Sequence, residues 1–493
     1  MSIDAAERSG DSGTAGRPRL RRPEGPRPGV GIVHLGLGAF YRAHGALYVA
    51  EAMARSGGDW GIVGVSLVSP VQRDRLAPQD FAYTALELGP GYEKPLVADV
   101  VQDVLVARED VAAVIAAMAD PGVRIVTLTV TEKGYCHEPS TGRLNVAHPD
   151  IVHDLANPES PRSAPGVLVA ALAKRRAAGT PPFTVLTCDN LPENGKVVQA
   201  AVVELARLRD PGLADWIAAK GRFPSTMVDR IVPATKDEDI ERLAALTGVL
   251  DLSPVMHEPF RQWVVEDDFV GGERPDLGAV GVQLVADVTP FEMMKLRCLN
   301  GTHSSLAYLG YLAGHETISD TVADPAFAAF VRHLWRDEII PTVPTPPGVD
   351  LGGYAEALFQ RYANPAIRHR TWQIAMDGSQ KLPQRLLGTI ADARAAGRET
   401  PGLALAIAAW MRYVGGVDEA GAAIAVRDPL AARLKALSDA AGSPEAKVAA
   451  LLGVREIFPE ALAGDAGFRT AVTEAYRMLV ETGARGAVAR VAG

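Results

Sequence analysis

The chain contains only three cysteines among 493 residues, and they are far apart in the sequence. Cys136, Cys188 and Cys298 are odd in number and include no CxxC pair. They therefore form neither a disulfide framework nor a set with zinc-ligand spacing. We expect a protein of the reducing cytoplasm with no metal site.

Long apolar runs and an excess of positive charge are also missing. No stretch approaches the ~20 apolar residues that a membrane-spanning helix requires. The 50 Lys and Arg residues are outnumbered by 59 Asp and Glu residues, which gives a net charge of -9. Because nucleic-acid phosphates are bound by basic surfaces, this balance argues against such a partner. We expect neither a nucleic acid nor a membrane among the partners.

Only the N-terminal segment is basic. Residues 16–28 are rich in Arg and Pro, and no apolar stretch that could be the core of a secretory signal follows them. The segment has no apolar face, and proline blocks regular strand pairing. We predict that residues 1–28 form a disordered leader.

The rest of the chain predicts two domains, since 493 residues exceed what one compact core accommodates. The first part alternates helical patterns with apolar, β-branched runs at 30–35, 60–67, 124–130 and 183–188. This is typical of an α/β doubly wound, Rossmann-like sheet. From Phe291 onward, Ala- and Leu-rich helical patterns dominate. The predicted domains are a dinucleotide-binding domain at 29–287 and a mostly α-helical substrate and catalytic domain at 288–493.

A glycine-rich turn follows the first predicted strand. Gly36 and Gly38 stand where a backbone loop can approach a pyrophosphate at the start of a helix. Tyr41 occupies the place of the third glycine of such loops, and no acidic residue for the adenosine ribose is evident after the second strand. Arg73 and Arg75 follow instead, as partners of a 2′-phosphate or as a solvated helix face. The choice between NAD and NADP stays open.

The segment that begins at Pro290 is the most informative. Proline at the start and Glu292 in the first turn predict a helix N-terminus. At about 100° per residue, Lys295, Asn300 and His303 fall within an arc of roughly 140°. One face of this helix, the Lys295 helix, therefore presents an amine, a carboxamide and an imidazole.

These side chains suit the oxidation of a secondary alcohol. A base must take the hydroxyl proton while hydride leaves the carbon. A free lysine, with a pKa of ~10.4, is a poor base, but burial or a neighbouring cation brings an amine toward neutrality. Donors such as the amide of Asn300 can polarise the carbonyl oxygen as charge builds on it. The alternative is an ordinary helix whose lysine reaches solvent and whose Asn and His pack or cap.

Several separate motifs add to this pattern. They are Gly36-x-Gly38-x-Phe40-x-Arg42-Ala-His44, Thr129-Val-Thr-Glu132-Lys133-Gly-Tyr135, Cys188-Asp189-Asn190, Val228-Asp229-Arg230-Ile, Glu258-Pro-Phe-Arg261-Gln-Trp263, the Lys295 helix, and Asp377-Gly-Ser-Gln-Lys381-Leu-Pro. With them the chain resembles, from about residue 31 to its end, the polyol-specific long-chain dehydrogenases, the family of mannitol 2-dehydrogenase and fructuronate reductase.

The resemblance implies a metal-independent, NAD-dependent reaction on a small sugar acid or polyol. By matching position, Lys295 is the general base, and Asn190 and Asn300 form the pair that stabilises the oxyanion. Glu292 relays the proton from Lys295 to solvent. With Asn190 contributed by the first domain, the resemblance places the reaction between the two domains.

The resemblance also implies binding roles. His303 and Lys381 hold substrate hydroxyls. The implied cofactor-binding residues are Gly36, Gly38, Phe40, Arg42, Val228 and Asp229.

The far end of the substrate is less determined. Mannitol 2-dehydrogenases tend to have an arginine where Gln373 stands, and the sequence from Arg368 to Arg385 looks closer to the fructuronate reductase branch. A uronate carries a carboxylate, for which a guanidinium is the preferred partner. Arg261 and Arg370 are candidates for that role, and each could equally be a surface ion-pair partner.

The leading hypothesis is the reduction of D-fructuronate to D-mannonate with NADH, and its reverse. The alternative is a mannitol 2-dehydrogenase or an enzyme for a related polyol such as arabinitol. A different class is a non-catalytic nucleotide-binding sensor, which would require a broken Lys295, Asn300 and Asn190 set; the set is intact. Relatives are often monomers, and we expect a monomer.

Overall fold

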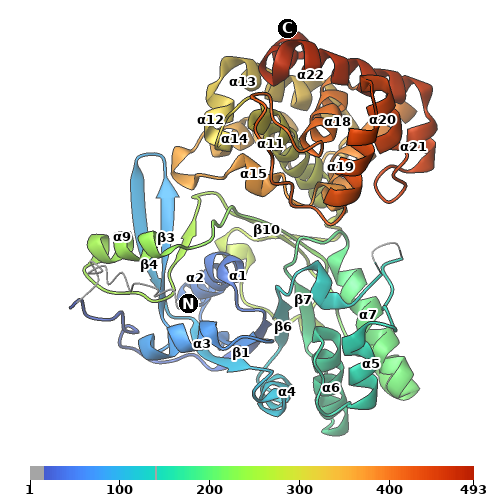
Figure 1. The fold of residues 1–493 in the computed structure, drawn as a ribbon. Coiled ribbons are helices and arrows are strands. Elements are labelled where there is room, and N and C mark those ends of the chain that lie inside the picture. The colour runs from blue at the N-terminus through green and yellow to red at the C-terminus, as the bar shows by residue number, and fades with distance from the viewer. Residues whose placement is uncertain (1–15, 139–140) are drawn as a thin grey trace, which may run out of the picture. The chain divides into compact units, whose positions relative to one another are not determined.

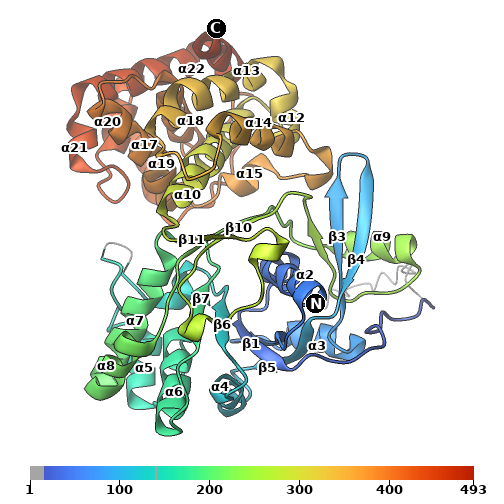
Figure 2. The same ribbon diagram turned by 180° about the vertical axis from the view of Figure 1, so that it is seen from behind.

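The chain divides between Thr289 and Pro290 into two units, an N-terminal one with three β-sheets and a C-terminal one of helices (Figures 1 and 2). The computed structural model describes residues 16–138 and 141–493. The predicted boundary, between residues 287 and 288, lies two residues before the division. The α/β fold class and the helical second part are confirmed.

A five-stranded parallel sheet is the centre of the N-terminal unit. Its strand order is β5-β2-β1-β6-β7, with bounds Val101–Val106, Gly61–Ser66, Val30–Leu35, Ile125–Leu128 and Thr184–Thr187. The strands are apolar because both faces of the sheet are covered. The strand order reverses between β1 and β6, and open α/β sheets bind ligands at such a point, beyond the carboxyl ends of the strands.

Two hydrophobic clusters cover the two faces of this sheet. One contains the apolar sides of α4 (Val111–Ala119), α6 (Ala164–Ala177), α7 (Asn194–Arg209) and α8 (Pro211–Lys220). The other contains α1 (Ala39–Ala43) and α2 (Gly45–Ser56), with Leu76 of α3 (Val71–Leu76). Figure 1 shows α4 and α6 grouped apart from α1 and α2. α5 (Pro149–Ala156) lies beside α7.

Two smaller sheets were not predicted from the sequence. One has the order β4-β3-β9, with bounds Tyr92–Ala98, Tyr83–Gly89 and Val255–His257; the other has the order β11-β10-β8, with bounds Gln283–Val285, Gln262–Glu266 and Thr226–Asp229. The β3–β4 hairpin is inserted between two strands of the parallel sheet, and α9 (Asp237–Thr247) lies between β8 and β9 in the chain. The alternation of strand and helix patterns in the sequence therefore predicted only the parallel sheet.

Residues 16–28, predicted as part of a disordered leader, pack onto the N-terminal unit instead. Leu20 is buried, and its backbone N–H donates to the carbonyl of Leu250. Arg22 donates to the carbonyl of Val101 at 3.0 Å, and Arg27 pairs with Asp80. A single buried leucine with backbone pairing leaves no periodic signal, so composition could not reveal it. Residues 1–15 lie outside the described residues.

The C-terminal unit is built around α18 (Pro401–Tyr413), whose side chains from Gly402 to Met411 are all buried. The other helices are α10 (Thr289–Met294), α11 (Thr302–Leu312), α12 (Ile318–Ala323), α13 (Pro325–His333), α14 (Leu351–Tyr362), α15 (Thr371–Ile374), α16 (Gly378–Leu382), α17 (Gly388–Ala395), α19 (Ala431–Ala440), α20 (Pro444–Leu452), α21 (Glu460–Gly464) and α22 (Ala466–Ala492). α11 and α22 pack against α18. α18 is apolar on all sides because it contacts α11, α20 and α22.

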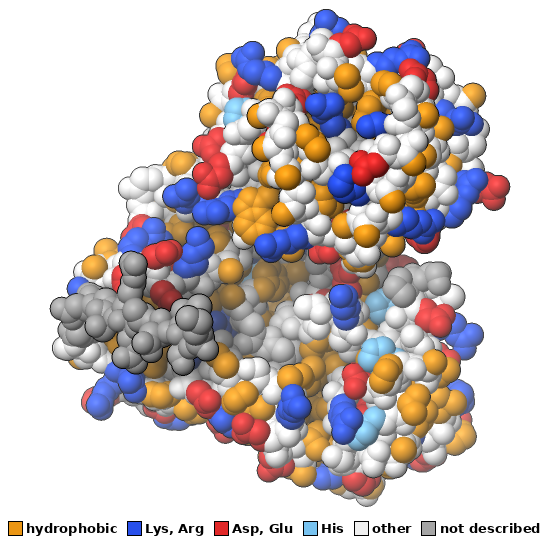
Figure 3. Space-filling model, in the orientation of Figure 1, with side chains coloured by type: hydrophobic (Ala, Val, Ile, Leu, Met, Phe, Trp, Pro, Cys, Tyr) orange, Lys and Arg blue, Asp and Glu red, His pale blue; other side chains and the backbone are white. Residues whose placement is uncertain are grey.

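The surface carries charges of both signs. On the face seen in Figure 3, acidic and basic side chains are interspersed over the C-terminal unit. Among the described residues, no helix combines the length and the apolar character needed to cross a membrane.

The turn after β1 supplies a test of the fold. Gly36 has φ 90°, and a Cβ there would clash with the carbonyl of Thr129, whereas a Cβ at Gly38 would meet nothing closer than 3.7 Å. We predict that Gly36→Ala lowers the free energy of unfolding by about 1–3 kcal/mol, measured by denaturant titration. Gly38→Ala is the matched control, with little change expected. Equal stability of the two variants would contradict this account of the turn.

Candidate active site

The predicted cofactor loop lies at the carboxyl end of β1, where the order of the parallel sheet reverses. Gly38 is exposed and precedes the single-turn helix α1, and Phe40 is partly buried with its ring 5.1 Å from that of His44. His34 lies beneath the loop, where its Nε2 contacts the hydroxyl of Thr129 at 2.9 Å. The loop is therefore tied to β6 through Thr129.

Three other residues of the predicted cofactor set lie inside the unit. Arg42 is buried, donates to the carbonyl of Ser253 at 2.5 Å and lies over the ring of Tyr83. Burial lowers the pKa of this guanidinium to about 10. Val228 and Asp229 are buried in β8. These contacts give Arg42 a structural function, and the cofactor-binding role of the three residues stays a prediction.

The side chain of Asp189 connects two of the sequence motifs, the one at residues 129–135 and the one at residues 188–190. Its carboxylate, at the end of β7, accepts the backbone N–H groups of Val130 and Thr131 at 2.8 and 3.0 Å and the hydroxyl of Tyr135 at 2.6 Å. Burial raises the pKa of this carboxyl, and the three donors oppose the shift. The network joins the loop after β6 to the loop after β7. Asn190 follows directly and is exposed, so its backbone is anchored while its side chain lies at the surface.

The Lys295 helix is present, but it is not α-helical throughout. Its middle, η5 (Lys295–Gly301), is a π-helix between α10 and α11. In a π-helix the hydrogen bonds run from i to i+5, and such segments are frequent at functional sites. Lys295 and Asn300 are therefore one wide turn apart and closer around the axis than α-helical geometry predicts. Lys295, Asn300 and His303 are all buried, with 8%, 8% and 7% exposure.

Side chains from other helices stabilise this wide turn. The indole N–H of Trp335 donates to the carbonyl of Cys298 at 2.9 Å, and the hydroxyl of Tyr362 donates to that of Leu299 at 2.7 Å. A Cβ on Gly301 would lie 2.7 Å from the carbonyl oxygen of Arg385, which lies in another π-helical segment, η9 (Pro383–Leu387). Only glycine allows η5 and η9 to approach this closely.

Several buried polar atoms on the helix lack a hydrogen-bond partner among the described residues, including one atom each of Asn300 and His303. Asn300 Nδ2 and His303 Nε2 are buried and make no hydrogen bond with the described residues. Because an unsatisfied buried polar group costs about 1–3 kcal/mol, such atoms mark places where a ligand can bind. Burial, and then the cations around it, holds the pKa of His303 well below its usual range. The imidazole is therefore neutral at physiological pH and can donate through one nitrogen and accept through the other.

Lys381 is positioned by the turn that precedes it. Asp377 has φ 56°, and Ser379 is fixed by two hydrogen bonds to Asp428, at 2.7 Å from its N–H and 2.6 Å from its hydroxyl. The short helix α16 then carries Lys381, whose Nζ donates to the carbonyl of Met376 at 2.5 Å. Burial, and then charge from Lys381, lowers the pKa of His369. The ring of His369 contacts that of His303 edge-on, and the two form a histidine pair.

The remaining predicted residues differ in their surroundings. Glu292 is partly buried in α10, three residues before Lys295. Arg261, in the N-terminal unit, makes two hydrogen bonds to Glu51 at 2.7 and 2.5 Å. Arg370 has Glu316 at 3.6 Å, and Gln373 is exposed. For both arginines the structure thus shows the ion-pair alternative.

Four residues around His303 were not predicted from the sequence as part of the site. The ring of Tyr362 stacks on it at 5.3 Å, that of His369 contacts it edge-on at 4.6 Å, and Arg361 and Arg385 contribute positive charge. The sequence could have indicated Arg385, because it follows Lys381 by four residues, a spacing that places two side chains on one face of an α-helix. No sequence pattern indicates Arg361 and Tyr362, since α14 contacts η5 only in the folded chain.

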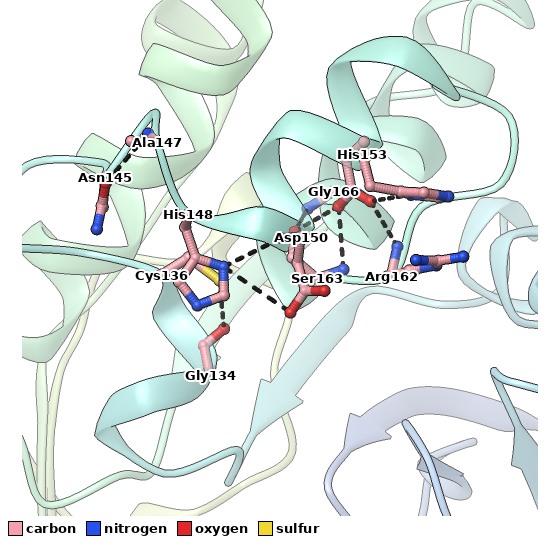
Figure 4. A network of polar contacts seen from close by, with 11 residues as sticks. Gly134, Cys136, Asn145, Ala147, His148, Asp150, His153, Arg162, Ser163 and Gly166 are labelled. Carbon is pink, nitrogen blue, oxygen red and sulfur yellow. Dashed lines mark hydrogen bonds and ion pairs between the residues drawn. The ribbon is translucent and has the colours of Figure 1, made fainter.

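The structure also brings Cys136, His148 and Asp150 together, which sequence spacing did not predict. One ligand atom of each lies within 4.8 Å of the others, and Figure 4 shows His148 beside Cys136. His148 Nδ1 accepts the backbone N–H of Asp150 at 3.2 Å and caps α5. Cys136, in the loop after Tyr135, thus lies close to His148 and Asp150 at the start of α5.

Comparisons with known proteins agree with this fold. The model of the mannitol dehydrogenase Rossmann domain matches residues 30–278, and that of the mannitol dehydrogenase C-terminal domain matches residues 287–480. The chain belongs to the mannitol dehydrogenase family, and the resemblance inferred from the motifs is confirmed.

Individual relatives cover nearly the whole chain. D-mannonate oxidoreductase of Escherichia coli is 49% identical over 93% of this chain and 95% of its own length. Mannitol 2-dehydrogenase of Pyricularia oryzae is 40% identical over 96% and 95%. The solved ternary complex of Pseudomonas fluorescens mannitol 2-dehydrogenase with NAD and D-mannitol matches with a TM-score of 0.85, 40% identity and 97% coverage of both chains.

The histidine pair gives a pH-dependent prediction. The pKa of His369 is lowered to about 4, first by burial and then by Lys381, whereas an unfolded chain has about 6.5. The unfolded state binds more protons between these values. The stability from neutral His369 is therefore complete above pH ~6.5 and is lost as pH falls toward 4. An NMR titration, with the resonance identified by its loss in His369→Gln, should show a midpoint near 4; a midpoint near 6.5 would contradict the burial.

Proposed function

We propose that the protein is an NAD-dependent oxidoreductase that interconverts a sugar acid and its keto form, D-mannonate and D-fructuronate. The buried amine, carboxamide and imidazole on one wide turn, with two unpartnered polar atoms among them, carry the assignment of the reaction type. The choice of sugar acid is supported by the 49% identity to a D-mannonate oxidoreductase.

The residues present fit a dinucleotide. Gly38, in the turn at the reversal point of the sheet, leaves its backbone open, since a Cβ there would meet nothing closer than 3.7 Å, so a cofactor can approach it closely. Arg73 contacts two carboxylates, those of Asp74 and Glu109, which favours NAD over a 2′-phosphorylated cofactor. When bound, NADH supplies the hydride that the keto carbon accepts.

Lys295 handles the proton of the reacting oxygen. In reduction its ammonium group gives a proton to that oxygen as the oxygen becomes an alkoxide. In oxidation the neutral amine takes the proton from the hydroxyl. Glu292, one turn earlier on the same helix, passes the proton between Lys295 and solvent.

Two carboxamides stabilise the charge that develops on the oxygen. Asn300 has a buried Nδ2 without a partner among the described residues, so a substrate oxygen can accept its N–H. Asn190 is the second donor, and its backbone is fixed through Asp189. His303, neutral and buried, suits substrate hydroxyls because it can both donate and accept, and Lys381 donates to a further hydroxyl.

A mannitol 2-dehydrogenase is the second candidate, and a specific observation favours it: the chain matches a mannitol 2-dehydrogenase solved with NAD and D-mannitol at 40% identity over 97% of both chains. D-fructose differs from D-fructuronate in ending with a hydroxymethyl group where the uronate has a carboxylate. The two candidates share every step above and differ only in what binds that end.

An assay of NADH oxidation with D-fructuronate and D-fructose in parallel separates the candidates. We expect kcat/KM for fructuronate to exceed that for fructose, because the positive charge near His303 matches a carboxylate. A higher value for fructose would favour the mannitol 2-dehydrogenase. Binding of NADH without turnover of any ketose or ketouronate would favour a sensor.

Replacing the general base tests the mechanism. Lys295→Ala should lower kcat by about 10²–10⁴-fold, the contribution of a positioned acid–base group, and leave the Kd for NADH nearly unchanged. Lys435→Ala is the control, since Lys435 is half-exposed on α19 and pairs with Asp439. A Lys295→Ala variant that keeps its kcat but binds NADH weakly would contradict the general-base role.

A further inference from the structure

The two rings of the histidine pair contact each other but do not satisfy each other's nitrogens. The rings of His303 and His369 lie 4.6 Å apart at an interplanar angle of 73°. His303 Nε2 and His369 Nδ1 are both buried, and neither atom makes a hydrogen bond with the described residues. Native proteins seldom leave buried polar atoms in this state, because such atoms have lost water without gaining a partner. Two of them on neighbouring rings point to a ligand with more than one polar group.

Backbone contacts hold the segment that carries His369. Its carbonyl accepts the N–H of Ile318 at 2.9 Å, and the N–H of Thr371 donates to the carbonyl of Glu316 at 3.0 Å. None of these contacts uses the imidazole. Arg368, directly before the histidine, has φ 29°, a value that is unfavourable for a residue with a Cβ. The chain therefore adopts a strained turn here, and such strain is frequent at ligand-binding sites.

Both imidazoles are neutral at physiological pH. Burial holds the pKa of His303 well below its usual range and lowers the pKa of His369 to about 4. A neutral imidazole has one nitrogen that donates and one that accepts. A hydroxyl group also donates and accepts, so it can satisfy either ring in either tautomer, whereas an apolar ligand would leave both buried nitrogens unsatisfied. The chemistry of the pair therefore fits a chain with hydroxyls on neighbouring carbons.

The histidine pair is continuous with the proposed place of reaction. Asn300, the proposed donor to the reacting oxygen, stands on the same helix as His303 and one turn before it. Its Nδ2 is also buried without a hydrogen-bond partner among the described residues. The side chains with unsatisfied atoms thus follow one another from the Lys295 helix to the segment before α15. A polyhydroxy chain is a ligand that can reach from the reacting carbon to both rings.

We propose that His369 is a substrate-binding residue, and that it and His303 bind hydroxyls on neighbouring carbons of the substrate. This inference rests on the proposed function and deepens it. It assigns the histidine pair to the hydroxylated chain of the substrate, which a sugar acid and a ketose share, and not to the end at which they differ. A substrate that lacks one of the two hydroxyls should therefore lose the contribution of one ring.

The first test removes the nitrogens of His369 and keeps a ring. His369→Phe can still pack edge-on against His303, but it offers no hydrogen bond. We expect it to lower kcat/KM for D-fructuronate by about 10- to 100-fold, the range for losing a hydrogen bond in a buried site. The Kd for NADH, followed by fluorescence, should stay unchanged. His369→Gln, which restores a donor and an acceptor, should recover part of the loss.

The second test uses substrate analogues that each lack one secondary hydroxyl. A bound hydroxyl and its partner side chain are energetically coupled, so their removals do not add. We expect His369→Phe to reduce kcat/KM for every analogue except one, the analogue that lacks the hydroxyl bound by His369. A structural role alone would lower kcat/KM for all analogues by the same factor.

A matched control is His153→Phe. His153 lies on α5 in the N-terminal unit, and its partner Asp154 keeps the N–H groups of Arg162 and Ser163 as donors, so this variant should retain the activity with every substrate. Suppose that the unmodified protein reduces fructuronate or fructose. If His369→Phe then affects all analogues equally, or none of them, the binding role of His369 is wrong and the proposed function stands. If the unmodified protein reduces neither, the proposed function fails, and the inference fails with it.

Discussion

The wide turn from Lys295 to Gly301 is the constraint on which the candidate site depends. A π-helical turn leaves backbone carbonyls displaced from their usual partners, and here Trp335 and Tyr362 donate to two of them. Gly301 lets the segment that contains Arg385 approach the turn. Without these three contacts, an ordinary α-helix would place Asn300 farther from Lys295 around the helix axis than the wide turn does.

The Lys295 helix also connects the proposed base with side chains from other helices. The helix that supplies the proposed base also supplies His303 and Ser304, and Ser304 binds the side chain of Arg385. A substrate that contacts both Lys295 and His303 would therefore be held by one short stretch of backbone. Catalysis benefits from such rigidity because reacting groups that are already oriented need less reorganisation in the transition state.

Many residues of the motifs serve the fold rather than the chemistry. Asp189 ties two loops together, Arg42 is bound in the interior of the N-terminal unit, and Arg230 donates to the carbonyl of Ala43 at 2.7 Å. Each is a buried or partly buried polar group whose partners come from distant segments, so its loss would leave those partners unsatisfied. A conspicuous motif residue in this chain can thus either bind a ligand or stabilise the fold, and only its contacts in the folded chain distinguish the two functions.

The sequence by itself determined the parallel sheet, the glycine turn after β1, the helical second part and the Lys295 helix, because each leaves a local pattern of apolar residues, glycine or proline. It also determined the family, through motifs whose order is preserved along the chain. The tertiary structure decided the π-helical turn, the docking of Leu20, the ion pair of Arg261 with Glu51, and the gathering of Arg361, His369 and Arg385 around His303. These features depend on contacts between segments far apart in the chain, and no local periodicity records such contacts.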